Sequence, residues 1–194
     1  MMYSVDEIYS ATTEVKKSKF IAYLVPIEEY QKGLQQKLKD DNPKSNHTVY
    51  ALRYLNEFNQ IVENSSDDGE PKGSSGVPAL NVLRGKELIN CAILIVRYFG
   101  GIKLGIGGLA RAYSLATKNA LEVSDLILYQ HQIEYRFSSS YSNINQISYR
   151  LNEIGINNIN RNFGVESVEW RVKGNQEQID KVIEFGTLIT INKT

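Results

Sequence analysis

The chain has 194 residues, of which 42% are hydrophobic and 23% are charged, so it can bury one large core or two small ones. Its 22 Lys and Arg residues balance its 22 Asp and Glu residues, which excludes a binder that relies on a strongly basic total charge. The one cysteine, Cys91, excludes an intramolecular disulfide, and its apolar surroundings predict a buried thiol in a reducing cytoplasm. No apolar segment approaches the roughly 20 residues that cross a bilayer, so we expect a cytoplasmic protein with no membrane partner.

The first part of the chain predicts strands interleaved with helices. Apolar and aromatic residues predict a strand at 20–26, and a polar helix at 28–41 is expected to end at Asn42-Pro43. A β-branched and aromatic run predicts a strand at 47–55, with 59–63 as its hairpin partner. A short helix, a buried strand, a longer helix and a short strand are then expected at 80–83, 91–98, 107–124 and 126–129.

Beyond residue 131 the predicted order is strand, helix, strand, strand, helix, strand. These elements are expected at 133–137, 142–154, 159–163, 167–172, 176–185 and 188–191. This βαββαβ order is the ferredoxin-like pattern. We therefore expect an α+β protein with two domains, at 1–131 and 132–194.

The segment from Arg97 to Tyr113 is the strongest candidate for a binding site. A buried strand leads into it, a helix leaves it, and its five glycines are Gly100, Gly101, Gly105, Gly107 and Gly108. The first turn of a helix presents free backbone N–H groups, and glycine lets a ligand approach the backbone closely. The segment therefore predicts a phosphate-binding turn, although glycines at such a junction can also serve helix packing alone.

All the charged residues around this turn are positive. Between residues 88 and 119 the charged residues are Arg97, Lys103, Arg111 and Lys118. Such a cluster suits a nucleotide or a nucleic-acid backbone. A Walker A loop does not fit, because Ile106-Gly107 stands where that motif requires Lys-Ser/Thr. A dinucleotide fingerprint does not fit either, because residues 99–104 separate the strand from the second glycine group.

A second candidate is the acidic turn that begins at Asp67, with His47 upstream. Asp67, Asp68 and Glu70 could hold a divalent metal through their oxygens, or act as acid and base. Alternatively, this is a solvated turn whose side chains accept hydrogen bonds from nearby backbone N–H groups. A third reading places these acids against the cations Arg97, Lys103 and Arg111, in one mixed-charge cleft.

Two blocks of this sequence resemble the signature of the YigZ/IMPACT family. The first is Asp67-Asp-Gly-Glu-Pro-Lys-Gly-Ser-Ser-Gly76 with Pro78 and Asn81-Val-Leu83, and the second is Arg97-Tyr-Phe-Gly-Gly-Ile-Lys-Leu-Gly105 with Gly107-Gly-Leu-Ala-Arg-Ala-Tyr-Ser114. The resemblance implies an N-terminal βαβ domain like domain 2 of ribosomal protein S five, and a ferredoxin-like C-terminal domain similar to the last domain of elongation factor G. The chain has His47-Thr-Val49 where the family often has His-x-Cys, which argues against a thiol-based or metal-based role for that strand.

The family's eukaryotic branch regulates translation by binding partners in the amino-acid-starvation kinase pathway, and it carries an extra partner-binding domain that this sequence does not show. Together with the cationic turn, the resemblance predicts a non-enzymatic cytoplasmic protein that contacts RNA, the ribosome or a translation factor. The alternative is a phosphate-binding or nucleotide-binding enzyme that uses Asp67, Asp68 and Glu70 with a divalent metal. The sequence requires no cofactor, and it does not determine the oligomeric state.

Overall fold

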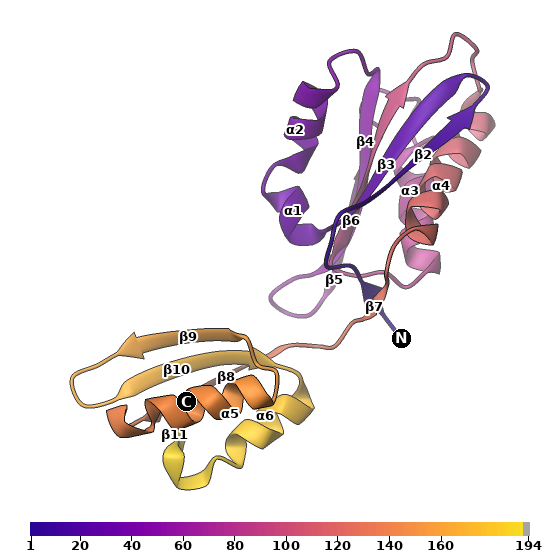
Figure 1. Ribbon diagram of the computed structural model, residues 1–194. Coiled ribbons are helices and arrows are strands. Elements are labelled where there is room, and N and C mark those ends of the chain that lie inside the picture. The colour runs from indigo at the N-terminus through magenta and orange to yellow at the C-terminus, as the bar shows by residue number, and fades with distance from the viewer. Residues whose placement is uncertain (192–194) are drawn as a thin grey trace. The chain divides into compact units, whose positions relative to one another are not determined.

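The chain divides into two compact units, Met1–Tyr129 and Gln130–Thr194 (Figure 1). A computed structural model describes residues 1–191. Each unit combines helices with an antiparallel sheet, so the protein is α+β, as the sequence predicts. No helix within the described residues has the length and apolar character needed to cross a membrane.

Unit 1 contains a five-stranded antiparallel sheet in the order β2-β3-β6-β4-β5. In that order the strands span Tyr9–Val15, Ser18–Pro26, Cys91–Tyr98, His47–Leu55 and Ile61–Ser66. The bounds of β4 and β6 are those expected from the sequence. The sequence prediction omits β2, because this edge strand is built largely from small and polar residues.

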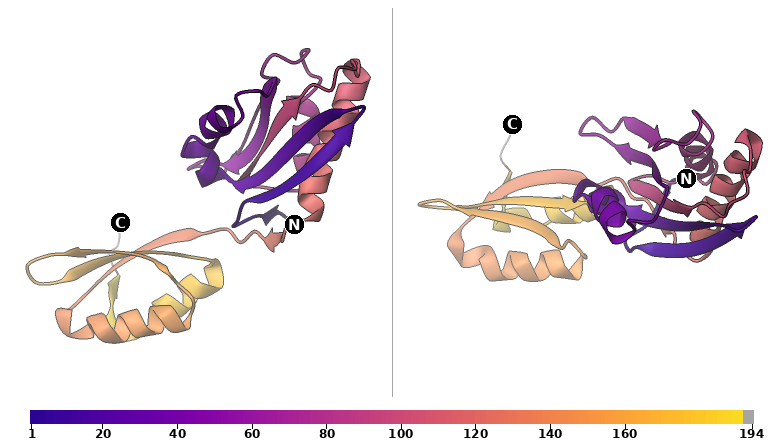
Figure 2. Two further views of the ribbon diagram at one scale, coloured as in Figure 1. Left: turned by 45° about the horizontal axis from the view of Figure 1, so that its top comes forward. Right: turned by 90° about the horizontal axis from the view of Figure 1, so that it is seen from above.

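Helices cover both faces of this sheet (Figures 1 and 2). Helices α1 (Ile27–Gln31) and α2 (Leu34–Asp41) lie on one face, and α3 (Gly76–Gly85) and α4 (Ile106–Glu122) lie on the other. The central strand β6 is buried on both sides because its side chains alternate between the two cores. Cys91 at its start is fully buried, as expected, and burial raises the pKa of its thiol to about 12.

Several helix and strand boundaries differ from the prediction. The single helix expected at 28–41 is two helices, because Gly33 between them has a φ of +91° that a continuing helix does not allow. Helix α3 begins at Gly76 rather than at residue 80, and Pro78 fits within its first turn. The short strands β1 (Tyr3–Ser4) and β7 (Ile127–Leu128) pair in a separate two-stranded sheet.

Unit 2 has a four-stranded antiparallel sheet in the order β11-β8-β10-β9. Its elements are β8 (Ile133–Ser139), η1 (Tyr141–Asn143), α5 (Ile144–Glu153), β9 (Asn158–Phe163), β10 (Val168–Gly174), α6 (Gln176–Ile183), η2 (Gly186–Leu188) and β11 (Thr190–Ile191). The order of main strands and helices agrees with the sequence prediction. Phe137 and Trp170 stack in its core with ring centroids 5.7 Å apart.

Candidate functional site

The predicted site residues gather at one end of unit 1. Strand register places the end of β6 beside the starts of two neighbouring strands, since Tyr98 pairs with Lys19 on β3 and Arg97 pairs with His47 on β4. The acidic turn follows β5 at this same end, because Ser66 pairs with Tyr50. Helix α4 also begins here, directly after the glycine-rich loop 99–105. The fold therefore brings both sequence blocks together.

Two glycines show why the loop 99–105 has its sequence. A Cβ at Gly100 would lie 2.0 Å from the carbonyl carbon of Lys17, so the loop packs directly on the β2–β3 turn. Gly105 precedes α4 with a φ of +72°, in the left-handed region that other residues rarely adopt. Their roles are close packing and backbone geometry at the helix start.

Glu70 and Arg97 form a buried ion pair between the sheet and α4. Nη1 of Arg97 and the hydroxyl of Tyr113 both donate to Oε1 of Glu70, the latter at 2.8 Å. The exposed fractions of the Glu70 and Arg97 side chains are 4% and 6%. An unpaired buried charge is strongly unfavourable, so each partner requires the other. The acidic turn and the segment 97–113 are thereby joined through the Glu70 carboxylate.

The Arg97 guanidinium also lies between two aromatic rings. Its central carbon is 5.4 Å from the Phe20 centroid and 5.7 Å from the Phe99 centroid. Its buried Nε has no hydrogen-bond partner among the described residues. A buried donor without an acceptor costs about 1–3 kcal/mol, so an acceptor brought to this nitrogen would be favoured.

Tyr113 and His47 complete the surroundings of Glu70. Burial and the nearby Glu70 carboxylate raise the pKa of Tyr113 well above its ordinary value, so its hydroxyl remains a hydrogen-bond donor. Nδ1 of His47 donates to the backbone carbonyl of Asp68 at 2.8 Å, which directs Nε2 toward Oε2 of Glu70 at 3.8 Å. The four side chains form one polar group beneath the start of α4.

The carboxylate of Asp67 organises the acidic turn itself. It accepts hydrogen bonds from the backbone N–H groups of Gly73, Ser75 and Gly76, and from the Ser75 hydroxyl. Burial alone would raise the pKa of Asp67, but these donors outweigh burial and hold it below its ordinary value. This is the turn-forming role that the sequence leaves open as an alternative.

The three carboxylates do not form a metal site in the described part of the chain. Asp68 accepts from Nζ of Lys39 and from the backbone N–H of Thr48, each at 2.6 Å, while Asp67 and Glu70 bind the other donors described above. No group of three or more metal-ligating side chains occurs within residues 1–191. The contacts therefore do not support the alternative in which Asp67, Asp68 and Glu70 share a divalent ion, because each carboxylate serves a different part of the fold.

A mixed-charge cavity lies beside the buried pair. Glu70, Arg97 and Lys103 all line this space of about 380 Å³, so two of the three cations named in the third sequence reading do face the acidic turn. Arg111 instead lines a smaller space of about 190 Å³ together with Lys16.

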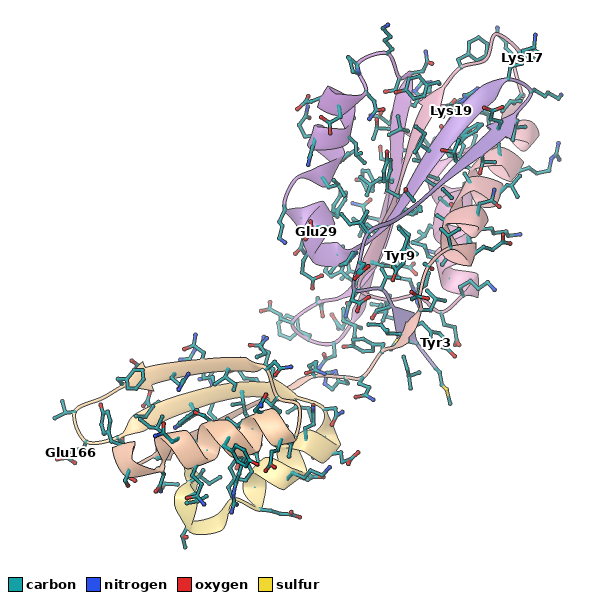
Figure 3. The ribbon with its side chains drawn as sticks, viewed as in Figure 1. Tyr3, Tyr9, Lys17, Lys19, Glu29 and Glu166 are labelled. Carbon is teal, nitrogen blue, oxygen red and sulfur yellow. The ribbon has the colours of Figure 1, made fainter. Side chains whose placement is uncertain are left out.

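Four exposed cations lie on the loop 99–105 or beside it: Lys103 belongs to the loop, and Lys16, Lys17 and Arg111 lie next to it. None of them forms an ion pair within the described residues. Figure 3 shows Lys17 at the β2–β3 turn, at the end of the unit where α4 begins. Lys19 is also exposed there, but Glu14 lies directly across from it in the strand register. We call the four unpaired residues the cationic end.

The expectation that Arg97 faces a phosphate backbone on the surface needs correction, since its side chain is buried against Glu70. Sequence reasoning missed Lys16 and Lys17, which join the site only because β2 and β3 carry their turn to the loop 99–105. It named Tyr113 only as the end of the candidate segment and gave it no role in the site. The position of Tyr113 two turns into α4, on the buried face, is the signal that could have indicated its contact with Glu70.

Comparison with known proteins identifies the family. The model of the Impact N-terminal domain matches residues 16–121, a range that contains the acidic turn, the loop 99–105 and nearly all of α4. The chain belongs to the IMPACT family. IMPACT family members from Haemophilus influenzae and Bacillus subtilis, the latter named YvyE, are 30% and 32% identical to it, over 77% and 78% of this chain and 74% and 70% of their own lengths. The member YigZ from Escherichia coli is 30% identical over 77% of this chain and 74% of its own length.

Solved structures agree with this membership in the IMPACT family. A crystal structure of a protein described as hypothetical is 25% identical in sequence, and it superposes with a TM-score of 0.71 over 99% of this chain and 97% of its own. The similarity therefore covers both units. Every residue of the cationic end and of the Glu70–Arg97 group lies within the matched range, 16–121.

Proposed function

We propose that this IMPACT-family chain is a non-enzymatic binding protein of the translation machinery that contacts RNA phosphates through the cationic end. The observation that carries the proposal is the gathering of Lys16, Lys17, Lys103 and Arg111 around one loop, without ion-pair partners in the described part of the chain. The translation link is supported by the family resemblance. RNA is the favoured partner because exposed lysine and arginine side chains suit a phosphate backbone.

Two ion pairs keep nearby carboxylates from pairing with the exposed cations. Glu70 is neutralised internally by Arg97, and Asp68 by Lys39, so these carboxylates do not neutralise the exposed cations. Phosphate contacts carry no base information, so the expected binding is tolerant of RNA sequence. It is also expected to be sensitive to salt, because phosphate neutralisation releases counterions.

The enzymatic alternative is not carried forward. It required Asp67, Asp68 and Glu70 to share a divalent ion, whereas their carboxylate oxygens accept hydrogen bonds from three different sets of protein donors. Recruiting these carboxylates to one ion would break the turn, the contact with β4 and the buried pair together.

The proposal is tested by the affinity of the full chain for a short single-stranded RNA, measured by fluorescence anisotropy. The double variant Lys103→Gln with Arg111→Gln is expected to weaken binding about tenfold, which corresponds to about 1.4 kcal/mol. Lys86→Gln is the matched control, because Lys86 is an exposed cation at the C-terminal end of α3. Equal affinities of the double variant and the control would overturn the proposal.

We also infer the finer fold classes and the domain division. The order β8-α5-β9-β10-α6-β11, with strand order β11-β8-β10-β9, supports a ferredoxin-like class for the C-terminal part, like the last domain of elongation factor G. The N-terminal part is proposed to share the class of domain 2 of ribosomal protein S five. The domains are proposed at 1–131 and 132–194, which limited proteolysis would test by cleavage near this boundary.

A cytoplasmic location completes the proposal, and the buried thiol of Cys91 accords with it.

A further inference from the structure

The cavity beside the buried ion pair has apolar walls and a charged floor. Phe99, Leu104 and Ile106 form part of the wall, and the side chains of Phe99 and Ile106 are 46% and 66% exposed. Arg97 reaches the cavity from the sheet side, and Lys103 from the loop. Its volume of about 380 Å³ is within the usual range for small-molecule sites.

The start of helix α4 supplies hydrogen-bond donors to this cavity. Helix α4 begins at its edge without a side-chain cap and without an acidic residue in the first turn. The N–H of Leu109 makes the first bond of the helix, to the carbonyl of Gly105, so the three amides of 106–108 precede it without a described partner. Seventeen residues of helix place a partial positive charge at this end.

Arg97 supplies the second, independent observation. Its side chain is 6% exposed, it lines the cavity, and its Nε has no partner within the described residues. The one carboxylate that lines the cavity belongs to Glu70, and its Oε1 already accepts from Arg97 and Tyr113. The cavity therefore offers the amides of 106–108 and the Lys103 ammonium as donors, and a carboxylate that is already engaged.

We propose that this cavity binds a phosphate monoester attached to an apolar or aromatic body, either a free nucleoside monophosphate or the 5′-phosphorylated end of an RNA strand. The phosphate oxygens accept from the α4 amides and from the cations, while the attached sugar or base packs on Phe99 and Ile106. This inference is independent of backbone binding by the cationic end, with which it shares only Lys103.

The test places a competing carboxylate at the helix start. Ile106→Asp places a carboxylate at the first position of α4. An acidic residue there stabilises the helix, and its charge competes with a bound phosphate. Ile106→Asn is the matched neutral control. Binding of adenosine monophosphate, adenosine and inorganic phosphate to each full-length protein is measured by calorimetry. We expect adenosine monophosphate to bind the wild type, and to bind the Asp variant about tenfold more weakly than the Asn variant, because both variants lose the apolar Ile106 side chain and only the Asp variant adds a negative charge.

Two RNA strands that differ only in their 5′ group distinguish a free nucleotide from an RNA end as the ligand. They also distinguish this inference from the proposed binding of the RNA backbone. A 5′-phosphorylated oligonucleotide that binds more tightly than its 5′-hydroxyl counterpart, with the difference abolished by Ile106→Asp, supports capture of an RNA end. Binding of adenosine monophosphate without that difference supports a free nucleotide. The inference is overturned if neither phosphate monoester binds better than adenosine, or if Ile106→Asp changes nothing. Backbone binding is read separately from the 5′-hydroxyl strand, whose affinity depends on the cationic end.

Discussion

Arg97 donates a hydrogen bond to Glu70 across a separation of 27 residues, and helix α4 covers the pair. The contact joins the acidic turn to the glycine-rich segment, which are the two sequence blocks that mark this chain. It also removes one acid and one cation from the surface. Of the cations in the second sequence block, those that a partner meets at this end are therefore Lys103 and Arg111, and not Arg97.

Glu70→Gln is expected to destabilise unit 1, because it leaves the charge of Arg97 buried without a counter-charge. Breaking a buried pair from one side costs about 3–5 kcal/mol. Hydrogen exchange of the β6 amides measures the effect in unit 1 directly. Glu29→Gln is the control, since Glu29 pairs with Lys32 on the surface of α1 and such pairs contribute about 0–1 kcal/mol. Similar losses in the two variants would contradict a buried, interdependent pair.

Gly100→Ala and Gly107→Ala are expected to have opposite effects. A Cβ at Gly100 would collide with the backbone of Lys17, so the loop 99–105 must move and the protein loses stability. A Cβ at Gly107 meets only the end of the Arg111 side chain at 3.9 Å, and alanine there is expected to add about 0.4–1 kcal/mol by restricting the unfolded chain. Urea denaturation checks both, and a stabilised Gly100→Ala protein would show that the loop does not pack on the β2–β3 turn.

The buried thiol of Cys91 makes the stability of the folded protein fall at alkaline pH. Burial raises its pKa from 9.0 to about 12, so the unfolded chain releases the thiol proton first and stability falls as the pH rises above about 9. Between about pH 8 and about pH 10 the wild type should lose about 1.4 kcal/mol more than Cys91→Ala. Denaturation curves of both proteins at the two pH values measure this difference, and parallel losses would place the thiol in contact with solvent.

The carboxylate of Asp67 makes the stability of the folded protein fall at acid pH. Its pKa is lower in the folded protein than in the unfolded chain, so its contribution is present above about pH 4 and is lost as the pH falls through the folded-state pKa. Asp67→Asn should lower the urea midpoint near neutral pH and flatten its decline toward acid pH. A decline as steep as that of the wild type would show that the turn does not depend on the Asp67 carboxylate.

Much of the fold follows from patterns within single segments. Strand β6 is predicted because it opens with the uninterrupted apolar run Cys91–Val96, and α6 because its apolar residues recur at helical spacing. Edge strand β2 is missed because its short and polar side chains lack such a run. The break at Gly33 is missed because the residues on both sides of it have good helical character.

The sequence indicates the location of the candidate site but not the contacts within it. The glycine density and the single sign of charge identify the loop 99–105 without any structure. No local pattern shows that Glu70 neutralises Arg97, or that Lys17 lies against Gly100, because both contacts arise when distant strands end side by side. The exposed and buried cations of one motif can be separated only by tertiary packing.

The salt dependence of RNA binding tests the central claim most directly. The slope of log affinity against log salt concentration is about −0.7 for each phosphate neutralised on a single strand, so four contacts predict about −2.8. The variant with Lys16, Lys17, Lys103 and Arg111 all replaced by Gln should reduce the magnitude of the slope to nearly zero while leaving the fold intact, because none of these residues is paired within the described chain. An unchanged slope in that variant would contradict the assignment of the cationic end as the RNA-binding surface.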